Sequence, residues 1–236
     1  MSESPPSQRQ RSLEGIDFLQ GVPEALRESI GRRCRWKSVG ANERIIDYLD
    51  ESDDVIFLVS GKARAILYSA SGKAVAYRDI KSGSVFGEYA AIDGQMRSAS
   101  VEALEPCLLA SMSSAIFWEI LADQPTFSRA IILHLVKQIR SLTRRVFEFS
   151  TLAVRNRIQA ELLRLARDAA PKSNVVHIEN APTHEEIASR ISTHRQAVTS
   201  EFNHLAQIGL IEQRGRTLSV KDIARLDRMV NEATGE

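Results

Sequence analysis

The stretch Phe86–Ser98, FGEYAAIDGQMRS, places a carboxylate, Glu88, nine residues before a guanidinium, Arg97. Gly87 precedes Glu88 and has no Cβ, so a ligand can approach the backbone closely there. A guanidinium followed by the hydroxyl and amide of Ser98 suits a phosphate, and a carboxylate suits a sugar hydroxyl. An ion pair between Glu88 and Arg97 across a hairpin is the structural alternative. The spacing alone leaves both interpretations open.

The residues around this stretch predict β-structure from Trp36 to about Ala115. Short runs rich in Val, Ile and Leu are separated by turn residues at Gly61, Ser71–Gly72 and Gly83, which is the spacing of a β-sandwich or barrel. We therefore expect an antiparallel β-roll or jelly roll that carries residues 87–98 as an irregular insertion. Helices before and after it make the fold class α+β.

Composition restricts the class of protein. The 236 residues suffice for two modest domains and a connector, and a net charge of +1 requires any basic patch to be local. No run of about 18 apolar residues is present, so no membrane span is expected. The polar residues 1–12 predict a disordered tail, not a signal peptide, and the protein is expected to be cytoplasmic.

The residues that would support catalysis are missing from the strand region. All five histidines lie beyond it, so the barrel lacks imidazole ligands for a metal, and no Ser/His or Cys/His pair occurs there. Two distant cysteines, Cys34 and Cys107, form no disulfide framework and are too few for an iron–sulfur cluster. We expect no enzyme, no metal site and two inert thiols.

Helical patterns flank the strands. Residues 13–33 predict short helices interrupted at Gly21–Pro23, and helical structure returns at Phe117. Further on, a heptad pattern predicts a two-helix dimer seam at Ile132, Leu135, Ile139, Leu142, Val146 and Phe149. The alternative is an amphipathic helix packed on its own barrel. Thr143 lies beside the seam, where it could reach a ligand held by a partner subunit.

The C-terminal part predicts two helices joined by a short turn. A capping box at Thr183 and Glu186 opens the first helix, and we expect a second capping box from Thr193 to Gln196 to open the next. That second helix begins with Arg195 and Gln196, followed one turn later by Ser200, and the start of such a helix meets base edges in DNA.

A hairpin, LIEQRGRTLSV, follows the second helix and carries Arg214 and Arg216 on either side of Gly215. A basic hairpin of this kind can hold backbone phosphate. Helix pairs with tight turns occur in many helical domains, but the added hairpin favours a winged helix-turn-helix.

Two resemblances fit these observations. FGE, eight residues and then RSASV resembles the phosphate-binding cassette of cyclic-nucleotide-binding domains. This implies that Glu88 holds the ribose 2′-hydroxyl and Arg97 holds the cyclic phosphate. The resemblance implies the following binding residues: Phe86, Gly87, Glu88, Tyr89, Arg97, Ser98, Ala99, Leu142 and Thr143.

From Phe117 to about Val220 the chain resembles the CRP/FNR family of bacterial transcription factors, in its cAMP receptor protein branch, and is similar to Clr-type regulators. The resemblance implies a cyclic-nucleotide domain (13–127), a dimerisation helix (128–150) and a DNA-binding domain (151–236). It implies a homodimer that binds cAMP, with cGMP as the alternative, and that binds a palindromic operator in double-stranded DNA and RNA polymerase. Implied DNA contacts are Thr183, His184, His194, Arg195, Gln196, Thr199, Ser200, Arg214 and Arg216.

Two departures from that branch affect specificity. The branch reads DNA with an Arg-Glu pair and a second Arg, whereas this chain has Arg195, Gln196 and Ser200, so we expect a different half-site. Leu142 stands where the branch has the threonine that meets the adenine, with Thr143 next, so we expect cAMP and cGMP to bind with similar affinity and cAMP to activate. The alternatives are the same regulator with another nucleotide, heme or no effector, a barrel enzyme, or a binding module.

Overall fold

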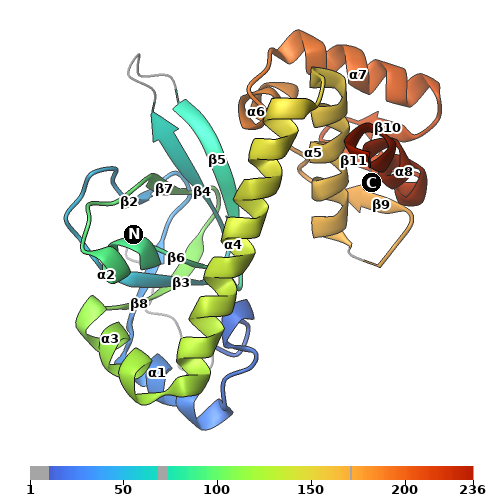
Figure 1. Cartoon of the computed structure of the whole chain (residues 1–236). Helices are drawn as coiled ribbons and strands as arrows, with labels where there is room; N and C mark the ends of the chain where they lie inside the picture. Colours follow the sequence, from blue (N-terminus) through green and yellow to red (C-terminus); the bar gives the residue numbers. More distant parts are fainter. Residues whose placement is uncertain (1–10, 69–73, 171, 236) are drawn as a thin grey trace. The chain divides into compact units, whose positions relative to one another are not determined.

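The computed structural model describes residues 11–68, 74–170 and 172–235 (Figure 1). The chain forms two compact units, the first ending at Gln138 and the second beginning at Ile139. Most of the tail expected over residues 1–12, and the turn expected at Ser71–Gly72, lie outside the described residues. In the part of the chain that is described, no helix has the length and hydropathy needed to cross a membrane.

The described strands of the first unit form two four-stranded sheets, ordered β1-β8-β3-β6 and β2-β7-β4-β5, with antiparallel pairing throughout. The strands are β1 (Arg35–Val39), β2 (Arg44–Ile46), β3 (Val55–Ser60), β4 (Lys62–Tyr68), β5 (Ala74–Lys81), β6 (Val85–Phe86), β7 (Ser100–Ala103) and β8 (Cys107–Met112). The predicted antiparallel β-roll is therefore confirmed.

Strand β3 shows how the pattern of apolar residues builds this unit. Successive side chains of a strand point to opposite faces. Ile56 and Leu58 accordingly pack into the core that both sheets share, whereas Val55 and Phe57 pack into a second core with residues of the helices. A continuous apolar run thus serves two cores.

The helices of the first unit are η2 (Asp17–Leu19), α1 (Glu24–Arg33), α2 (Glu88–Asp93), α3 (Ser114–Asp123) and the beginning of α4 (Pro125–Thr151). Pro23 is the N-cap of α1, which confirms the predicted interruption. Figure 1 shows α1 and α3 together at one end of the roll, where Ile30, Phe117 and Phe127 share a core. The insertion predicted as irregular instead contains the short helix α2.

Helix α4 buries only the first part of its apolar surface. Phe127 and Ile131 are almost fully buried in the core of the first unit. The predicted seam is different: Leu135 is half-buried, and the remaining five residues are exposed by 39% to 64% of their area. These exposed residues are Ile132, Ile139, Leu142, Val146 and Phe149. The alternative of a helix packed along its own barrel therefore accounts for its first turns only.

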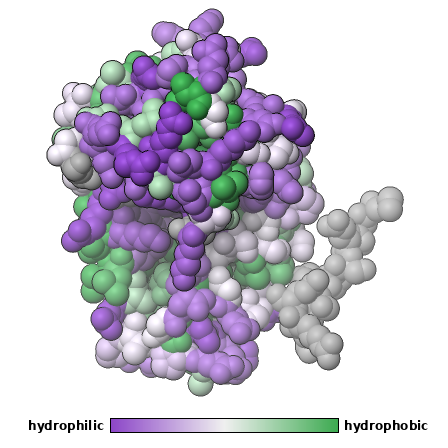
Figure 2. All heavy atoms as spheres, turned by 90° about the vertical axis from the view of Figure 1, so that its right-hand side faces the viewer, coloured by the Kyte–Doolittle hydropathy of each residue, from purple (hydrophilic) through white to green (hydrophobic). Residues whose placement is uncertain are grey.

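The face of the molecule drawn in Figure 2 is mostly hydrophilic, and hydrophobic side chains show on it as small separate patches. Against such a surface, a row of exposed aliphatic and aromatic residues on one helix is a candidate interaction site.

The second unit consists of the end of α4, then α5 (Val154–Ala169), α6 (His184–Arg190), α7 (Arg195–Gln207) and α8 (Ile223–Thr234), with strands β9 (Val176–Ile178), β10 (Ile211–Arg214) and β11 (Thr217–Val220). The strands form an antiparallel sheet ordered β10-β11-β9. Val198, Phe202 and Leu205, the predicted apolar face of α7, are buried in the core of this unit. The predicted helix pair followed by a hairpin is confirmed.

Candidate functional sites

A pocket in the first unit brings together the residues of the quoted stretch. The space within its lining, open solvent included, is about 540 Å³. The pocket is lined by Ile46, Ala65, Arg78, Ile80, Phe86, Gly87, Glu88, Tyr89, Ala90, Arg97, Ser98, Ala99, Val101 and Gln138. Of the nine predicted ligand contacts, seven are in this set.

Arg97 is held in place by oxygen atoms of neighbouring loops. Its Nε donates to Ser52 Oγ (3.0 Å), Nη1 to the Gly87 carbonyl (2.8 Å) and Nη2 to the Asp54 carbonyl (2.9 Å). These contacts use three of the five N–H bonds that a guanidinium has. The residue is only 3% exposed yet lines the pocket, so it presents a fixed positive group to a ligand.

Two opposing effects act on the charge of Arg97. Burial lowers the pKa of the guanidinium, and the nearby carboxylates of Asp54, Asp50 and Asp53 raise it. An arginine stays protonated in proteins even when it is buried. The pocket therefore contains a permanent cation, which suits an anionic ligand.

Gly87 makes this arrangement possible. It adopts φ +82°, and a Cβ at this position would lie 2.7 Å from Arg97 Nη1 and 2.9 Å from the Asp54 carbonyl. No side chain can be added there without moving the guanidinium or the loop. From the sequence, Gly87 was predicted to allow close approach of a ligand, whereas in the structure the group that approaches the glycine is Arg97.

Glu88 is oriented by helix α4. Its carboxylate is 3% exposed, and Oε1 accepts a hydrogen bond from Gln138 Nε2 (2.8 Å). His134 Nε2 lies 3.4 Å from the same oxygen, and Arg78 Nη1 donates to Gln138 Oε1. Glu88 and Arg97 therefore have separate partners, and the alternative of a simple ion pair between them does not describe this structure.

Gln138, His134 and Arg78 were not predicted from the sequence. A signal for two of them existed: His134 and Gln138 are four residues apart on α4, so they share one face beside the apolar seam. Leu142 and Thr143, which were predicted to meet the purine, lie outside the pocket lining and are exposed on α4. The Thr143 hydroxyl donates to the Ile139 carbonyl.

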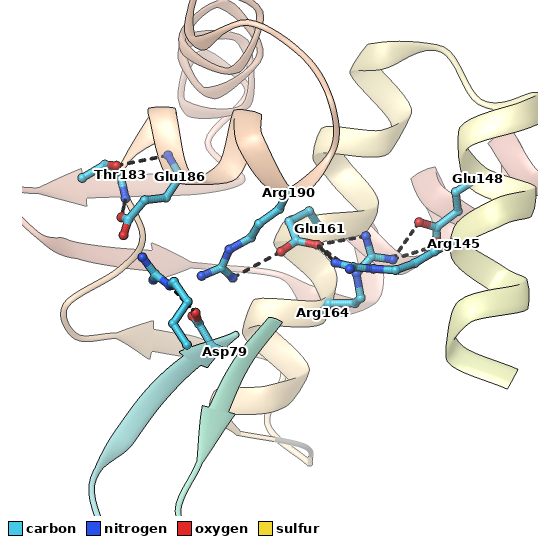
Figure 3. Close-up of polar contacts among 9 residues, drawn as sticks. Asp79, Arg145, Glu148, Glu161, Arg164, Thr183, Glu186 and Arg190 are labelled. Atoms are coloured by element: carbon cyan, nitrogen blue, oxygen red, sulfur yellow. Dashed lines mark hydrogen bonds and ion pairs between the residues drawn. The ribbon is translucent and has the colours of Figure 1, made fainter. Parts of the chain in front are cut away.

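The second candidate site is the helix pair α6–α7. The capping box that opens α6 is present: Thr183 Oγ1 accepts from the Glu186 amide (3.2 Å), and Glu186 Oε2 accepts from the Thr183 amide (2.7 Å) (Figure 3). The expected second capping box is wrong. Thr193 belongs to the turn, where its amide donates to the Ala188 carbonyl, and the N-cap of α7 is His194, without a side-chain hydrogen bond.

The outer surface of α7 forms an open groove that contains the predicted base-contacting residues. It is lined by Arg195, Gln196, Thr199, Ser200 and Asn203. Asn203 was not predicted, although it lies on the same face eight residues after Arg195. Polar side chains aligned on one exposed helix face have the form needed to read base edges in the major groove.

Contacts of two side chains, Glu201 and His184, hold α7 in its orientation. Glu201 is 6% exposed and accepts from Gln159 Nε2 (2.6 Å) and Arg155 Nε (3.0 Å), both on α5. On the opposite side, His184 Nδ1 lies 2.9 Å from Thr199 Oγ1, and the His184 ring packs on Phe202. His184 thus supports the recognition surface from behind, while His194 is exposed at the N-cap.

The hairpin β10–β11 turns at Gly215, which has φ +59°. Arg214 Nε bonds to Glu212 (2.6 Å), and Lys221 bonds to the same carboxylate (2.8 Å), so these cations lower the pKa of Glu212. Arg214 and Arg216 are both exposed at the tip of the hairpin. The Glu212 carboxylate therefore offsets part of the positive charge of the predicted wing.

Among the described residues, no group of three or more His, Cys, Asp or Glu side chains is placed to hold a metal ion. Cys34 and Cys107 are buried free thiols. Burial raises the pKa of Cys34 from 9.0 to about 12, so this thiol stays protonated and unreactive at neutral pH.

A ligand pocket built on a β-roll, together with a winged helix-turn-helix, defines the chain as a ligand-binding, DNA-binding regulator. Comparison with family models agrees: residues 36–124 match the cyclic nucleotide-binding domain and residues 156–229 match the Crp-like helix-turn-helix domain. The chain belongs to the CRP/FNR family. Members of this family are transcriptional regulators, so the prediction that the chain is not an enzyme is confirmed.

Individual relatives are distant. The cAMP-activated global transcriptional regulator CRP of Pasteurella multocida is 23% identical over 188 residues, which cover 79% of this chain and 90% of the relative. A CooA mutant from Carboxydothermus hydrogenoformans has a similar structure, with a TM-score of 0.75, 20% identity and coverage of 94% and 98%. The regulator CLP of Xanthomonas campestris, described as c-di-GMP responsive, gives a TM-score of 0.67, 19% identity and coverage of 80% and 94%.

Proposed function

We propose that the chain is a homodimeric transcription regulator whose binding to DNA is controlled by cAMP. The observation that carries this proposal is the pair Glu88 and Arg97 in one pocket, with Glu88 hydrogen-bonded to Gln138 of α4. The carboxylate would accept the ribose 2′-hydroxyl, and the guanidinium would bind the cyclic phosphate. The ligand contacts and DNA contacts predicted from the sequence are part of this proposal. So are the predicted domain limits, 13–127, 128–150 and 151–236.

The proposed mechanism is linkage between the pocket and helix α4. A ribose hydroxyl bound at Glu88 would share the carboxylate with the Gln138 amide, so ligand binding would act on a group that contacts α4. Ordering of α4 would set the two recognition helices of a dimer about one turn of DNA apart, ~34 Å, on a palindromic operator. A ligand shifts such an equilibrium only through its different affinities for the two states.

The exposed seam of α4 supports the homodimer. Ile139 and Val146 are exposed by 62% and 64%, and a second copy of the helix would bury both. This dimer would bring two recognition helices onto one operator, next to bound RNA polymerase. Because the proposed partners are bacterial DNA and polymerase, we propose a cytoplasmic location.

A second effector is favoured by the composition of the pocket. Glu88, Arg97 and Ser98 would bind sugar and phosphate, which cAMP and cGMP share, and the lining contains no contact from Leu142 or Thr143. We therefore propose that cGMP binds with similar affinity but activates less well. One structural neighbour is described as c-di-GMP responsive, so another effector is the alternative.

Isothermal titration calorimetry tests the ligand assignment. The purified chain is titrated with cAMP, cGMP, 2′-deoxy-cAMP and 5′-AMP. We expect similar affinities for the first two. The deoxy analogue should bind several-fold more weakly because it lacks the hydroxyl that Glu88 accepts. Equal binding of cAMP and the deoxy analogue, or no binding of any cyclic nucleotide, would contradict the assignment.

A further inference from the structure

The second unit contains a buried cluster of charged side chains that neither the pocket nor the recognition surface uses. Glu161 of α5 lies at its centre and is 3% exposed. Its carboxylate contacts three arginines from three different helices, as Figure 3 shows: Arg145 of α4, Arg164 of α5 and Arg190 of α6.

The two oxygens of Glu161 contact different arginines. Glu161 Oε2 accepts from Arg164 (2.9 Å) and lies 3.6 Å from Arg145 Nη2. Glu161 Oε1 lies 3.4 Å from Arg190 Nη1, on the last residue of α6. Arg164 in turn holds Glu148 of α4 through two hydrogen bonds of 2.7 and 2.8 Å. One carboxylate therefore joins the end of α4 to the first helix of the helix-turn-helix.

Such a cluster adds little to the free energy of unfolding, but it favours one relative position of the helices that carry it. Burial of charged groups costs hydration, and the attraction between them offsets that cost only roughly, so buried ion pairs contribute little net stability. A buried charge without a partner is strongly disfavoured, so the arrangement in which every charge is paired is favoured. Here that arrangement fixes the end of α4 relative to α6.

Helix α6 is in turn tied to the reading helix. Ile187 and Ala188 of α6 pack in the same core as Val198 of α7, and His184 contacts Thr199 and Phe202. A displacement of α6 would therefore act on α7, which carries Arg195, Gln196 and Ser200.

We infer that Glu161 is a positioning residue that transmits the state of α4 to the DNA-reading helix, through Arg145 on one side and Arg190 on the other. This inference rests on the proposed function, because it assumes that ligand binding acts on α4. Glu161 itself touches neither ligand nor DNA in this scheme. Its effect is on the coupling between the two binding events.

The test removes the direct contact between Glu161 and α4, and it leaves the indirect contact through Arg164 and Glu148 in place. Arg145→Met keeps a long side chain but loses the charge, and it leaves Glu161 paired with Arg164 and Arg190. Arg145→Lys retains a charge that can reach the carboxylate. Asp227→Asn is the matched control, because it breaks another α5 ion pair, Arg167–Asp227 (2.7 Å), which includes neither α4 nor α6.

The measured quantity is the coupling ratio, which is the DNA dissociation constant without cAMP divided by that with saturating cAMP, in the full chain on a selected duplex. Allosteric ratios are typically about 5- to 150-fold. We expect Arg145→Met to lower the ratio at least about fivefold, while cAMP affinity of the DNA-free protein stays near that of the wild type. Arg145→Lys and Asp227→Asn should keep the wild-type ratio.

Three results with the variants would overturn the inference. One is a wild-type ratio in Arg145→Met. Another is an equal fall in Asp227→Asn. The third is loss of DNA binding in both states together with a lower Tm, which would make the cluster purely structural. If the wild type binds DNA but shows no response to cAMP, the proposed cAMP control fails, and the inference fails with it.

Discussion

At the scale of single residues, the proposed binding of a cyclic phosphate depends on Arg97. Its three protein contacts fix the guanidinium before any ligand arrives, so little conformational entropy is lost on binding. Preorganisation of this kind explains why an arginine can lie 3% exposed beside a cluster of aspartates and still be available to a phosphate.

Arg97→Ala is expected to weaken cAMP binding by about 5- to 150-fold, because a phosphate without its partner costs about 1–3 kcal/mol. Calorimetry measures the change. Arg35→Ala is the matched control: Arg35 pairs with the side chain of Asp54 but does not line the pocket. Normal cAMP binding by Arg97→Ala would show that the pocket is assigned wrongly.

Gly87→Ala and Gly94→Ala separate backbone strain from the contact with Arg97. Both glycines have positive φ, +82° and +67°, but an added Cβ meets the guanidinium and a carbonyl only at Gly87. Strain of this kind costs about 1–3 kcal/mol, so both variants should lose stability in urea denaturation. Only Gly87→Ala should also lose cAMP affinity. Equal ligand affinities in the two variants would contradict the role given to Gly87.

At the scale of elements, α4 and α7 carry the two recognition events. Ile139→Glu places a charge in the proposed dimer seam, where an unpaired buried charge costs about 3 kcal/mol or more. We expect sedimentation velocity to show a dimer for the wild type and a monomer for this variant at micromolar concentration. Lys137→Glu adds the same group to an exposed position of α4 off the seam and should remain dimeric. A dimeric Ile139→Glu would place the interface elsewhere.

The groove on α7 predicts which bases are read. Arg195 should contact guanine O6 and N7, while Gln196 suits adenine, each contact contributing about 1–3 kcal/mol of discrimination. Selection from random duplexes should return a half-site that shares one guanine with the Arg-Glu-Arg branch and differs toward its centre. Arg195→Ala should lose that guanine preference. Arg216→Ala should weaken all sequences alike and lower the salt slope by about 1. Recovery of the unchanged half-site of that branch would contradict this prediction.

Local patterns predicted most of these elements because their cause is local. The apolar runs of the strands, the heptad spacing in α4 and the capping box at Thr183 each depend on residues close in sequence, and all three are present. The predicted second capping box is absent because Thr193 belongs to the turn. Its amide donates to the Ala188 carbonyl, and Ser192 before it adopts φ +51°.

The parts of the site that were missed depend on contacts between distant segments. Gln138 lies 50 residues after Glu88, and Arg78 lies 60 residues before Gln138, so no spacing rule connects them. The same holds for the ion cluster, in which Glu161 meets Arg190 across 29 residues. A short motif was enough to predict the ligand-binding groups Glu88 and Arg97. The residues that orient Glu88, Gln138 and Arg78, were found only in the structure.

At the scale of the whole molecule, the central claim is that one ligand changes the affinity for DNA. The net charge of +1 gives the chain no general attraction to nucleic acid, so binding depends on the local surface of α7 and the hairpin. A change in the orientation of that surface would therefore act on most of the binding free energy.

The most direct test is fluorescence anisotropy of a labelled, selected duplex with the wild-type chain, without nucleotide, with cAMP and with cGMP. The salt concentration is kept constant, because protein–DNA affinity depends strongly on it. We predict tight binding with cAMP, and weaker binding with cGMP or without ligand. Equal binding in all three conditions would contradict cyclic-nucleotide control of this regulator.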